Sequence, residues 1–195
     1  MAPPPALLIA AREGDVNRVI QLLEEEDTRV NQKDHYGDTP LIKAIDHFHH
    51  EIVDILMGVA GIGINSRNRH GYSPLIRAAI TGNHYAALQL VWDRRIDVNQ
   101  PDYQGNKNII TPLSHAVLRG HHRVVEVLLQ HQAIKVNIPC IAGYTPLHNA
   151  SIKGHHEIVD CLLRHKDIEV NEVDKMGRTA LYMAASRGQF EVVKL

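Results

Sequence analysis

The chain has 195 residues, 22% of them charged, and its formal net charge at pH 7 is −1. This balance argues against a chain whose overall charge attracts nucleic acid. Its 2 cysteines are too few for a disulfide framework, so we expect a reducing compartment, the cytoplasm or the nucleus. No apolar run reaches the length of a membrane span, and residues 1–8 lack the regions of a signal peptide, so we expect no membrane segment.

The first predicted helix pair follows an extended stub, residues 1–5, whose prolines cannot continue a helix. The pair occupies about residues 6–34. It carries an acidic run from Glu24 to Asp27 and is more polar than the later helix pairs. A polar outer unit is typical of the end of a repeat array, so we predict an N-terminal boundary here.

Each later unit begins with a helix-capping pair. A Thr or Ser hydroxyl accepts hydrogen bonds from the free N–H groups of a helix start, and proline fits the first helical position. The pairs are Thr39-Pro40, Ser73-Pro74, Thr111-Pro112 and Thr145-Pro146, with Thr179-Ala180 as a weaker copy. Their intervals are 34, 38, 34 and 34 residues. In the unit after Thr145, Gly154 ends the first helix, and the apolar stripe of Ile158, Val159 and Leu162 predicts a second helix antiparallel to it.

Polar turns join one unit to the next. An asparagine after Ile or Val recurs on the same period, at Asn31, Asn65, Asn99, Asn137 and Asn171. Each turn also has a glycine that supplies a positive φ, and its Asp and Asn side chains are expected to accept hydrogen bonds from nearby backbone N–H groups. Residues 106–110 carry the four extra residues of the long interval, which belong either to a binding face or to a tolerated surface loop.

These markers divide the chain into six units. Their approximate bounds are 6–34, 35–68, 69–102, 103–140, 141–174 and 175–195. The last unit stops partway through its second helix and leaves Phe190, Val192 and Val193 on a face without a following neighbour. We therefore interpret the sequence as a truncated array that continues beyond Leu195.

Together these motifs resemble the ankyrin repeat family. The shared pattern is G-x-T-P-L-x-x-A, a Gly-His pair, an apolar helix, and then V-N and a turn, over residues 5–195. Departures are local: only His148 supplies the family's histidine after T-P-L, and Phe48 stands where the second unit should have its inter-helix glycine. The resemblance implies an all-α solenoid of about six helix-turn-helix repeats with hairpin-like turns. It also implies a protein–protein interaction module without catalysis of its own.

The candidate catalytic and metal-binding residues are explained by the repeat. The 14 histidines include His121-His122 and His155-His156, but Gly-His is the family's inter-helix pair, and ligands on successive repeats are spaced along the stack. A Cys140 nucleophile with His148 or His115 lacks a base held by an orienting third group. We therefore predict no catalytic residue, no metal ligand and no cofactor.

Outward positions on the first helices and the turns are rich in tyrosine and basic residues, whereas acidic residues lie mostly on the second helices. Tyr and Arg bring large contact areas and directional donors to interfaces, although the same side chains serve equally well as covers for turns. The predicted partner-binding residues are Tyr36, Arg69, Tyr72, Arg77, Tyr103, Lys107, Arg119, Tyr144, Lys153 and Arg187. We expect a monomer whose concave face and turn tips bind a protein partner with an acidic surface.

Two other hypotheses remain open. The incomplete last unit is consistent with the targeting part of a larger enzyme, or of an effector that an intracellular bacterium sends into the cytosol of a host cell, with catalysis beyond Leu195. Nucleic-acid binding would need a strongly basic concave face, and the overall charge disfavours it.

The resemblance also implies a modification. Ankyrin-repeat asparagines that follow an acidic residue and a valine, with a leucine further upstream, resemble substrates of an oxygen-dependent asparaginyl hydroxylase. The segment from Leu163 to Asn171 matches this context, and Asn99 matches it with Val91 in place of the leucine. Hydroxylation of Asn171 and Asn99 is therefore a hypothesis.

Overall fold

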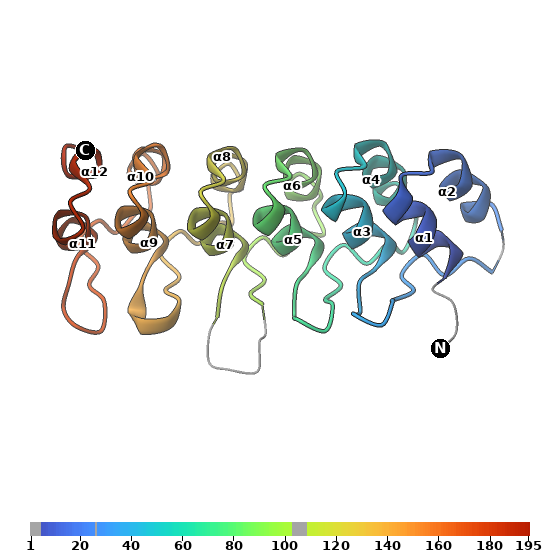
Figure 1. The fold of residues 1–195 in the computed structure, drawn as a ribbon, viewed down its shortest axis with the longest axis horizontal. Helices are drawn as coiled ribbons and strands as arrows, with labels where there is room; N and C mark the ends of the chain where they lie inside the picture. The colour runs from blue at the N-terminus through green and yellow to red at the C-terminus, as the bar shows by residue number, and fades with distance from the viewer. Residues whose placement is uncertain (1–4, 26, 103–108) are drawn as a thin grey trace.

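The computed structural model describes residues 5–25, 27–102 and 109–195, and in these ranges the chain is all-α (Figure 1). The first helix of each repeat is α1 (Ala6–Glu13), α3 (Pro40–Asp46), α5 (Pro74–Thr81), α7 (Pro112–Arg119), α9 (Pro146–Lys153) or α11 (Ala180–Ser186). The second helix is α2 (Val16–Leu23), α4 (His50–Met57), α6 (His84–Val91), α8 (His122–Leu129), α10 (His156–Leu163) or α12 (Phe190–Val193). A short 3-10 turn, η1, spans Ile141–Gly143. No helix in the described ranges has the length and apolarity needed to cross a membrane.

Capping fixes where the first helix begins in the second to sixth repeats. The hydroxyl of Thr111 accepts a hydrogen bond from the N–H of Ser114 at 3.2 Å, and proline occupies the first position of α7, as predicted. The first helix ends where the chain turns into the left-handed region, at Gly120 with φ 74°. In the second repeat, Phe48 adopts this backbone conformation at φ 59°, in the place of the missing glycine.

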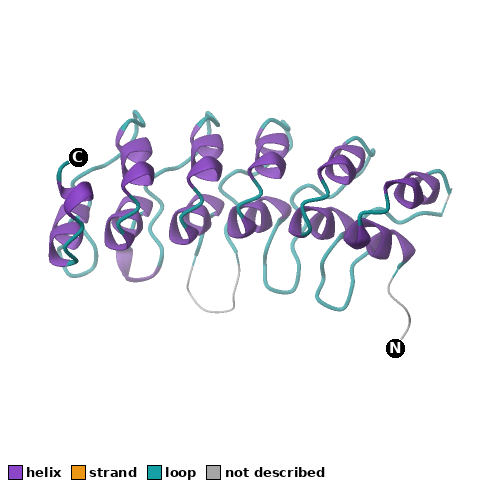
Figure 2. Ribbon diagram, turned by 45° about the horizontal axis from the view of Figure 1, so that its top comes forward, coloured by secondary structure: helices purple, strands orange, loops and turns teal. Residues whose placement is uncertain are grey.

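Stacking of like elements builds the array. Each first helix packs against the second helix of its own repeat and against the first helices of adjacent repeats. The side chains between them form one continuous apolar core, in which Ile45, Leu75, Leu90 and Leu128 are fully buried. The result is the elongated, gently bent row of helix pairs in Figure 2, with the turns projecting along one edge. The predicted solenoid is therefore confirmed, and each repeat is stabilised mainly by its nearest neighbours.

The recurring asparagine clamps each turn to the next repeat. The side-chain amide of Asn65 donates to the carbonyl of Arg95 at 2.7 Å, and its oxygen accepts from the N–H of Asp97 at 3.0 Å. Three other asparagines make the same pair of bonds one repeat further on: Asn31, Asn99 and Asn137. The period of this residue in the sequence therefore has a structural cause.

A second set of bonds links the start of each second helix to the preceding repeat. Nε2 of His49 lies 3.0 Å from the carbonyl oxygen of Arg12, and Nε2 of His121 lies 3.1 Å from that of Ile80. In the third repeat, Asn83 takes this role by donating to the carbonyl of Ile45 at 2.9 Å. His49, Asn83 and His121 thus join repeats to one another.

The turns are hairpin-like, as expected. The N–H of Asp34 donates to the carbonyl of Asp38 at 3.1 Å, and the carboxylate of Asp34 accepts from the N–H groups of Tyr36 and Asp38. Neighbouring turns are also joined, because the N–H of Arg69 donates to the carbonyl of Tyr36 at 2.9 Å. This network gives the turn tips a fixed spacing along the array.

The last repeat exposes the face that the inner repeats bury. Leu181 and Tyr182 are 58% and 57% exposed, whereas Leu147 and His148, which hold the same places one repeat earlier, are 3% and 1% exposed. The stacking face of α11 is therefore open. On α12, Phe190 and Val193 are exposed as predicted, but the prediction is wrong for Val192, which is 6% exposed because it packs into the core.

Candidate functional site

Two rows of side chains run along the first helices of the second to sixth repeats, one residue of each row per repeat. The inner row lies in the middle of these helices and consists of Lys43, Arg77, His115, Asn149 and Met183. The end row lies at their carboxyl ends and consists of His47, Thr81, Arg119, Lys153 and Arg187. The sequence predicts that both rows face outward. The structure shows that they differ in burial.

The side chains of the inner row form contacts with other residues of the chain. Nζ of Lys43, whose side chain is 15% exposed, lies 2.9 Å from the carboxylate of Asp34 and 2.6 Å from that of Asp38. Burial opposes the charge of Lys43, but hydrogen bonds and attraction from Asp38 and Asp34 outweigh it and raise its pKa. Nε of Arg77 lies 2.8 Å from the carboxylate of Asp46 one repeat earlier. These cations are paired within the chain.

His115 continues the inner row as a buried, neutral group. Its Nε2 lies 3.0 Å from the carboxylate of Asp102, yet burial lowers the pKa of His115 more than Asp102 raises it, and Arg119 and Arg77 add to the lowering. The ring of Tyr72 meets the ring of His115 edge-on, with centroids 5.8 Å apart. This part of the row is therefore a packed junction between repeats.

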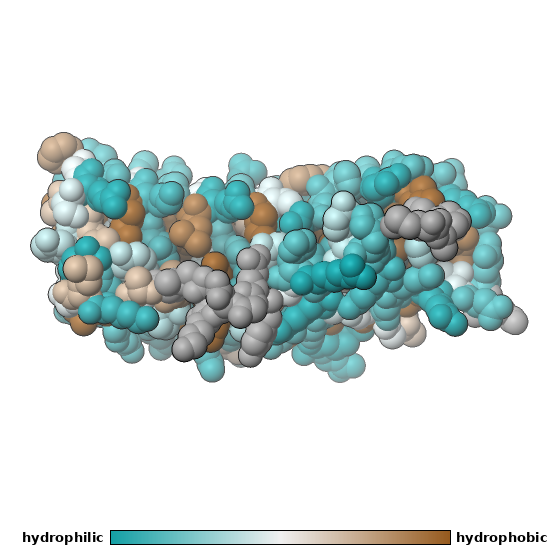
Figure 3. All heavy atoms as spheres, turned by 60° about the horizontal axis from the view of Figure 1, so that its bottom comes forward, coloured by the Kyte–Doolittle hydropathy of each residue, from teal (hydrophilic) through white to brown (hydrophobic). Residues whose placement is uncertain are grey.

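The last three members of the end row are exposed and basic. Arg119, Lys153 and Arg187 are exposed at the ends of α7, α9 and α11, where a cation also interacts favourably with the helix dipole. Within the described part of the chain, none of the three forms an ion pair with a carboxylate. The turn tips add Tyr36, 52% exposed, and the exposed Arg69. Figure 3, which brings the turns forward, shows a mainly hydrophilic face with separate hydrophobic patches.

The structure thus divides the predicted partner-binding residues into two described groups. The exposed group is Tyr36, Arg69, Arg119, Lys153 and Arg187. The half-buried group is Tyr72, Arg77 and Tyr144. The guanidinium of Arg77 lies 5.8 Å from the ring centroid of Tyr72, and the hydroxyl of Tyr144 accepts a hydrogen bond from Arg178 at 2.9 Å. Tyr103 and Lys107, and residues 106–108 of the predicted insertion, lie outside the described residues.

The two asparagines predicted as hydroxylation targets differ in setting. The amide of Asn99 is held by the carbonyl of Ala133 at 2.7 Å and by the N–H of Lys135 at 2.9 Å. Asn171, in contrast, is exposed. Hydroxylation of either residue remains a prediction, and the hydrogen bonds of Asn99 make Asn171 the more accessible target.

Asp174 organises the turn of the last repeat. Its side chain is 1% exposed and accepts hydrogen bonds from the backbone N–H groups of Met176 and Arg178 and from the guanidinium of Arg178, with Nη2 at 2.7 Å. Burial opposes ionisation, but the hydrogen bonds and charge of Arg178, with the N–H of Met176, lower the pKa of Asp174 to about 2.

We expect acid to weaken this turn, with the sign set by that lowered pKa. A carboxyl with a folded-state pKa of about 2, against 3.8 for the free group, contributes stability that is complete above the higher value and lost as pH falls through the lower one. Thermal unfolding of Asp174→Asn followed between these pH values should show a shallower loss of stability than in the unchanged chain. Asn68 holds the equivalent place and makes the same backbone bonds, so asparagine keeps the turn and removes only the charge. Parallel curves for the two proteins would contradict this role of Asp174.

The Cys140 cluster shows no catalytic arrangement in the described residues. Cys140 accepts a hydrogen bond from the amide of Asn149 at 3.4 Å. The ring of His148 contacts the hydroxyl of Thr145 through Nδ1 and the carbonyl of Arg178 through Nε2, at 2.9 Å each. The histidine therefore caps its helix and links two repeats.

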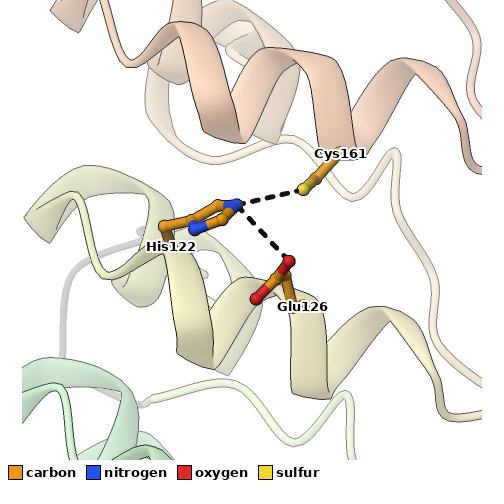
Figure 4. Close-up of side chains that lie close together, drawn as sticks. All are labelled: His122, Glu126 and Cys161. Carbon is orange, nitrogen blue, oxygen red and sulfur yellow. Dashed lines mark hydrogen bonds and ion pairs between the residues drawn. The ribbon is translucent and has the colours of Figure 1, made fainter.

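A different trio of chemically reactive side chains meets on the second helices. Nε2 of His122 on α8 lies 3.3 Å from Sγ of Cys161 on α10 and 3.6 Å from a carboxylate oxygen of Glu126 (Figure 4). Burial, with the charges of Glu126 and Asp160, raises the pKa of the Cys161 thiol. The sequence pattern does not point to this trio, because ligands on successive repeats are expected to lie apart along the stack. The detectable signal was a His and a Glu four residues apart, on one face of a helix beside a helix with a cysteine.

A stack of capped helix pairs with hairpin-like turns and an open polar face defines a helical repeat protein. The family model for ankyrin repeats matches residues 7–102 and 113–195. The chain belongs to the ankyrin repeat family, whose fold is a general, usually non-catalytic scaffold for protein interaction.

The relatives agree with this assignment. A putative ankyrin repeat protein of Rickettsia bellii is 30% identical over 128 residues, 65% of this chain and 68% of that protein. The probable E3 ubiquitin-protein ligase XBOS32 of Oryza sativa subsp. japonica is 33% identical over 63% of this chain, which spans only 24% of the ligase. The crystal structure of the ankyrin repeat protein EF0377 superposes with a TM-score of 0.87 at 27% identity, covering 100% of this chain and 97% of that one.

Proposed function

We propose that the chain binds a partner protein through the end row and the turn tips, and that the partner presents acidic groups. The observation that carries the proposal is the alignment of three exposed cations, Arg119, Lys153 and Arg187, on successive repeats without internal ion pairs among the described residues. Exposed acidic residues lie mostly on the second helices and in the loops after them, for example Glu51 and Glu126, with Glu13 at the end of α1 as an exception. Such a one-sided arrangement favours an oppositely charged partner and speeds its association.

The rigidity of the array supports the same proposal. Hydrogen bonds from Asn137 to the carbonyl of Asp167 and from Gln189 to the carbonyl of Ile152 link the fourth, fifth and sixth repeats, which carry the three cations. Few backbone torsions therefore have to be ordered when a partner binds. Tyr36 and Arg69 are exposed on joined turns and offer an aromatic and a guanidinium contact at the edge of the surface. We propose a monomeric array in the cytoplasm or nucleus, a setting that suits a chain with only 2 cysteines.

The test is a charge reversal in three consecutive repeats. The variant Arg119→Glu/Lys153→Glu/Arg187→Glu should retain a partner at least about 10-fold less well, because like charges then face each other across the interface. Retention is measured by affinity purification with quantitative mass spectrometry, followed by the salt dependence of Kd for the recovered protein. The matched control, Arg94→Glu/Arg123→Glu/Lys166→Glu, changes the net charge equally at exposed positions on and after the second helices.

Equal capture by the two triple variants, with both folded by circular dichroism, would reject the end row as the binding surface. Recovery of DNA or RNA in place of a protein, lost in the first variant alone, would instead support the nucleic-acid hypothesis. Either result leaves the fold and its family unchanged.

A second proposal concerns the whole protein. The alignment with the rice ligase covers 24% of that relative, so arrays like this one occur inside longer chains. We propose that this array serves as the targeting part of a larger enzyme or effector, which in the effector case would act in the cytosol of a host cell. The complete reading frame of the gene decides this, since a frame that adds no domain would contradict it.

A further inference from the structure

We propose that His122, Glu126 and Cys161 bind a Zn²⁺ ion that bridges the fourth and fifth repeats. The three side chains offer one imidazole nitrogen, one carboxylate oxygen and one sulfur, and these atoms all lie within 4.8 Å of one another. Figure 4 shows His122 between the other two residues, with Glu126 one turn further along α8 and Cys161 reaching across from α10. The ligands therefore converge from two helices of adjacent repeats.

The distances fit a tetrahedral ion. Zinc bonds of about 2.0–2.1 Å to nitrogen or oxygen and about 2.3 Å to sulfur, set at tetrahedral angles, place neighbouring ligand atoms roughly 3.3–3.6 Å apart. The observed separations from Nε2 of His122 are 3.3 Å to Sγ of Cys161 and 3.6 Å to the oxygen of Glu126. An ion can thus be accommodated by small side-chain rotations, without movement of the helices.

The donor set selects the metal. A sulfur ligand disfavours Mg²⁺ and Ca²⁺, which prefer oxygen, whereas one thiolate, one imidazole and one carboxylate suit Zn²⁺. The thiol of Cys161 loses its proton to solvent when the sulfur–zinc bond forms, and no oxidant or reductant takes part. Three protein ligands leave the fourth position to a water molecule, since the site opens into a surface pocket.

The surroundings favour a cation. The pocket is also lined by Glu157, Asp160 and Glu191. Its two nearby cations are already paired, Arg164 with Asp160 at 2.6 Å and Lys194 with Glu191 at 2.7 Å. His156, on α10, also lines the pocket and offers an imidazole in addition to that of His122. The trio and these neighbours together carry more negative than positive groups, so the local field attracts a divalent ion.

Among the described repeats, only the junction between the fourth and fifth has a histidine, a carboxylate and a cysteine at these three places. One repeat later, His156 and Asp160 hold the places of His122 and Glu126, but Leu195 stands where Cys161 would be. One repeat earlier, His84 is followed by Leu88, and Val127 takes the place of the cysteine. The general repeat pattern therefore does not account for this combination.

The experiment uses the full chain and Co²⁺ as a spectroscopic substitute for Zn²⁺. We expect one Co²⁺ per chain, with a thiolate-to-metal charge-transfer band and intense d–d bands of a tetrahedral complex, both lost when Zn²⁺ displaces it. In Cys161→Ser and His122→Ala, Zn²⁺ affinity measured by chelator competition should fall at least about 100-fold, because even loss of an outer-shell contact costs about 10–100-fold. His84→Ala, an exposed histidine at the same place in the third repeat, should bind as the unchanged chain does.

A structural readout complements the affinity. Zn²⁺ should raise the melting temperature of the unchanged chain and of His84→Ala, because the ion binds only when the fourth and fifth repeats are stacked. It should not raise that of Cys161→Ser. Three results would overturn the proposal: unchanged zinc affinity in Cys161→Ser, a cobalt spectrum without the charge-transfer band, or no binding at micromolar metal. Unchanged affinity in Cys161→Ser would assign the metal to other histidines.

Discussion

Replacing Leu90 by alanine is expected to lower the free energy of unfolding by about 3–5 kcal/mol, as for other leucines whose removal leaves a cavity in a rigid core. Leu90 is fully buried on α6, in the third of six stacked repeats. Its loss weakens the contacts of this repeat with both of its neighbours, and in a linear array these contacts hold the two halves together. Urea unfolding followed by circular dichroism measures the change.

Leu88→Ala is the matched control for this prediction. Leu88 lies two residues earlier on the same helix and is 36% exposed, so its truncation should cost less than about 1 kcal/mol. Both substitutions are the same in chemistry and almost the same in helix propensity. Equal losses of stability in the two variants would mean that α6 does not pack as the structure describes. A broadened transition in Leu90→Ala would indicate that the two halves then unfold separately.

Replacing Asn83 by alanine is expected to lower the free energy of unfolding by about 2–4 kcal/mol, because a helix cap and a buried inter-repeat bond are lost together. The side chain is 1% exposed. Its oxygen accepts from the N–H of Ala86 at 3.0 Å, and its nitrogen donates to the carbonyl of Ile45 at 2.9 Å. Alanine leaves that carbonyl with only the N–H of Phe48, at 3.2 Å, as a hydrogen-bond donor and removes the bond between the repeats. Thermal and urea unfolding both report the loss.

Asn83→His provides the sharper comparison. His49 and His121 hold the same place in other repeats, and each positions Nε2 at 3.0–3.1 Å from the corresponding carbonyl. Neither His49 nor His121 caps its helix through its side chain, so histidine at position 83 should restore the bond between repeats, but not the cap, and recover part of the stability lost in Asn83→Ala. If histidine destabilised the chain as much as alanine does, the carbonyl bond would not be the source of the effect. Asn17→Ala, at an exposed position of α2, should change stability by no more than about 0.5 kcal/mol.

The sequence by itself determined the repeat, its caps and its turns. Thr111, Pro112 and Gly120 specify the start and end of α7 through contacts within the same few residues, and equivalent residues do so for α5 and α9. A period of 34 residues then requires that like units stack. Because these features depend on local chemistry and on nearest neighbours, no knowledge of distant contacts was needed to predict the solenoid.

Only the tertiary structure decided which outward residues are available. Arg77 and Arg119 occupy similar outward positions in the sequence, yet Arg77 is paired with Asp46 of the preceding repeat and Arg119 is exposed. In the same way, the approach of His122 to Cys161 depends on how far α8 and α10 are offset when the two repeats pack. Such contacts between repeats are set by side-chain packing and by charge pairs across the stack, which a one-dimensional period does not encode.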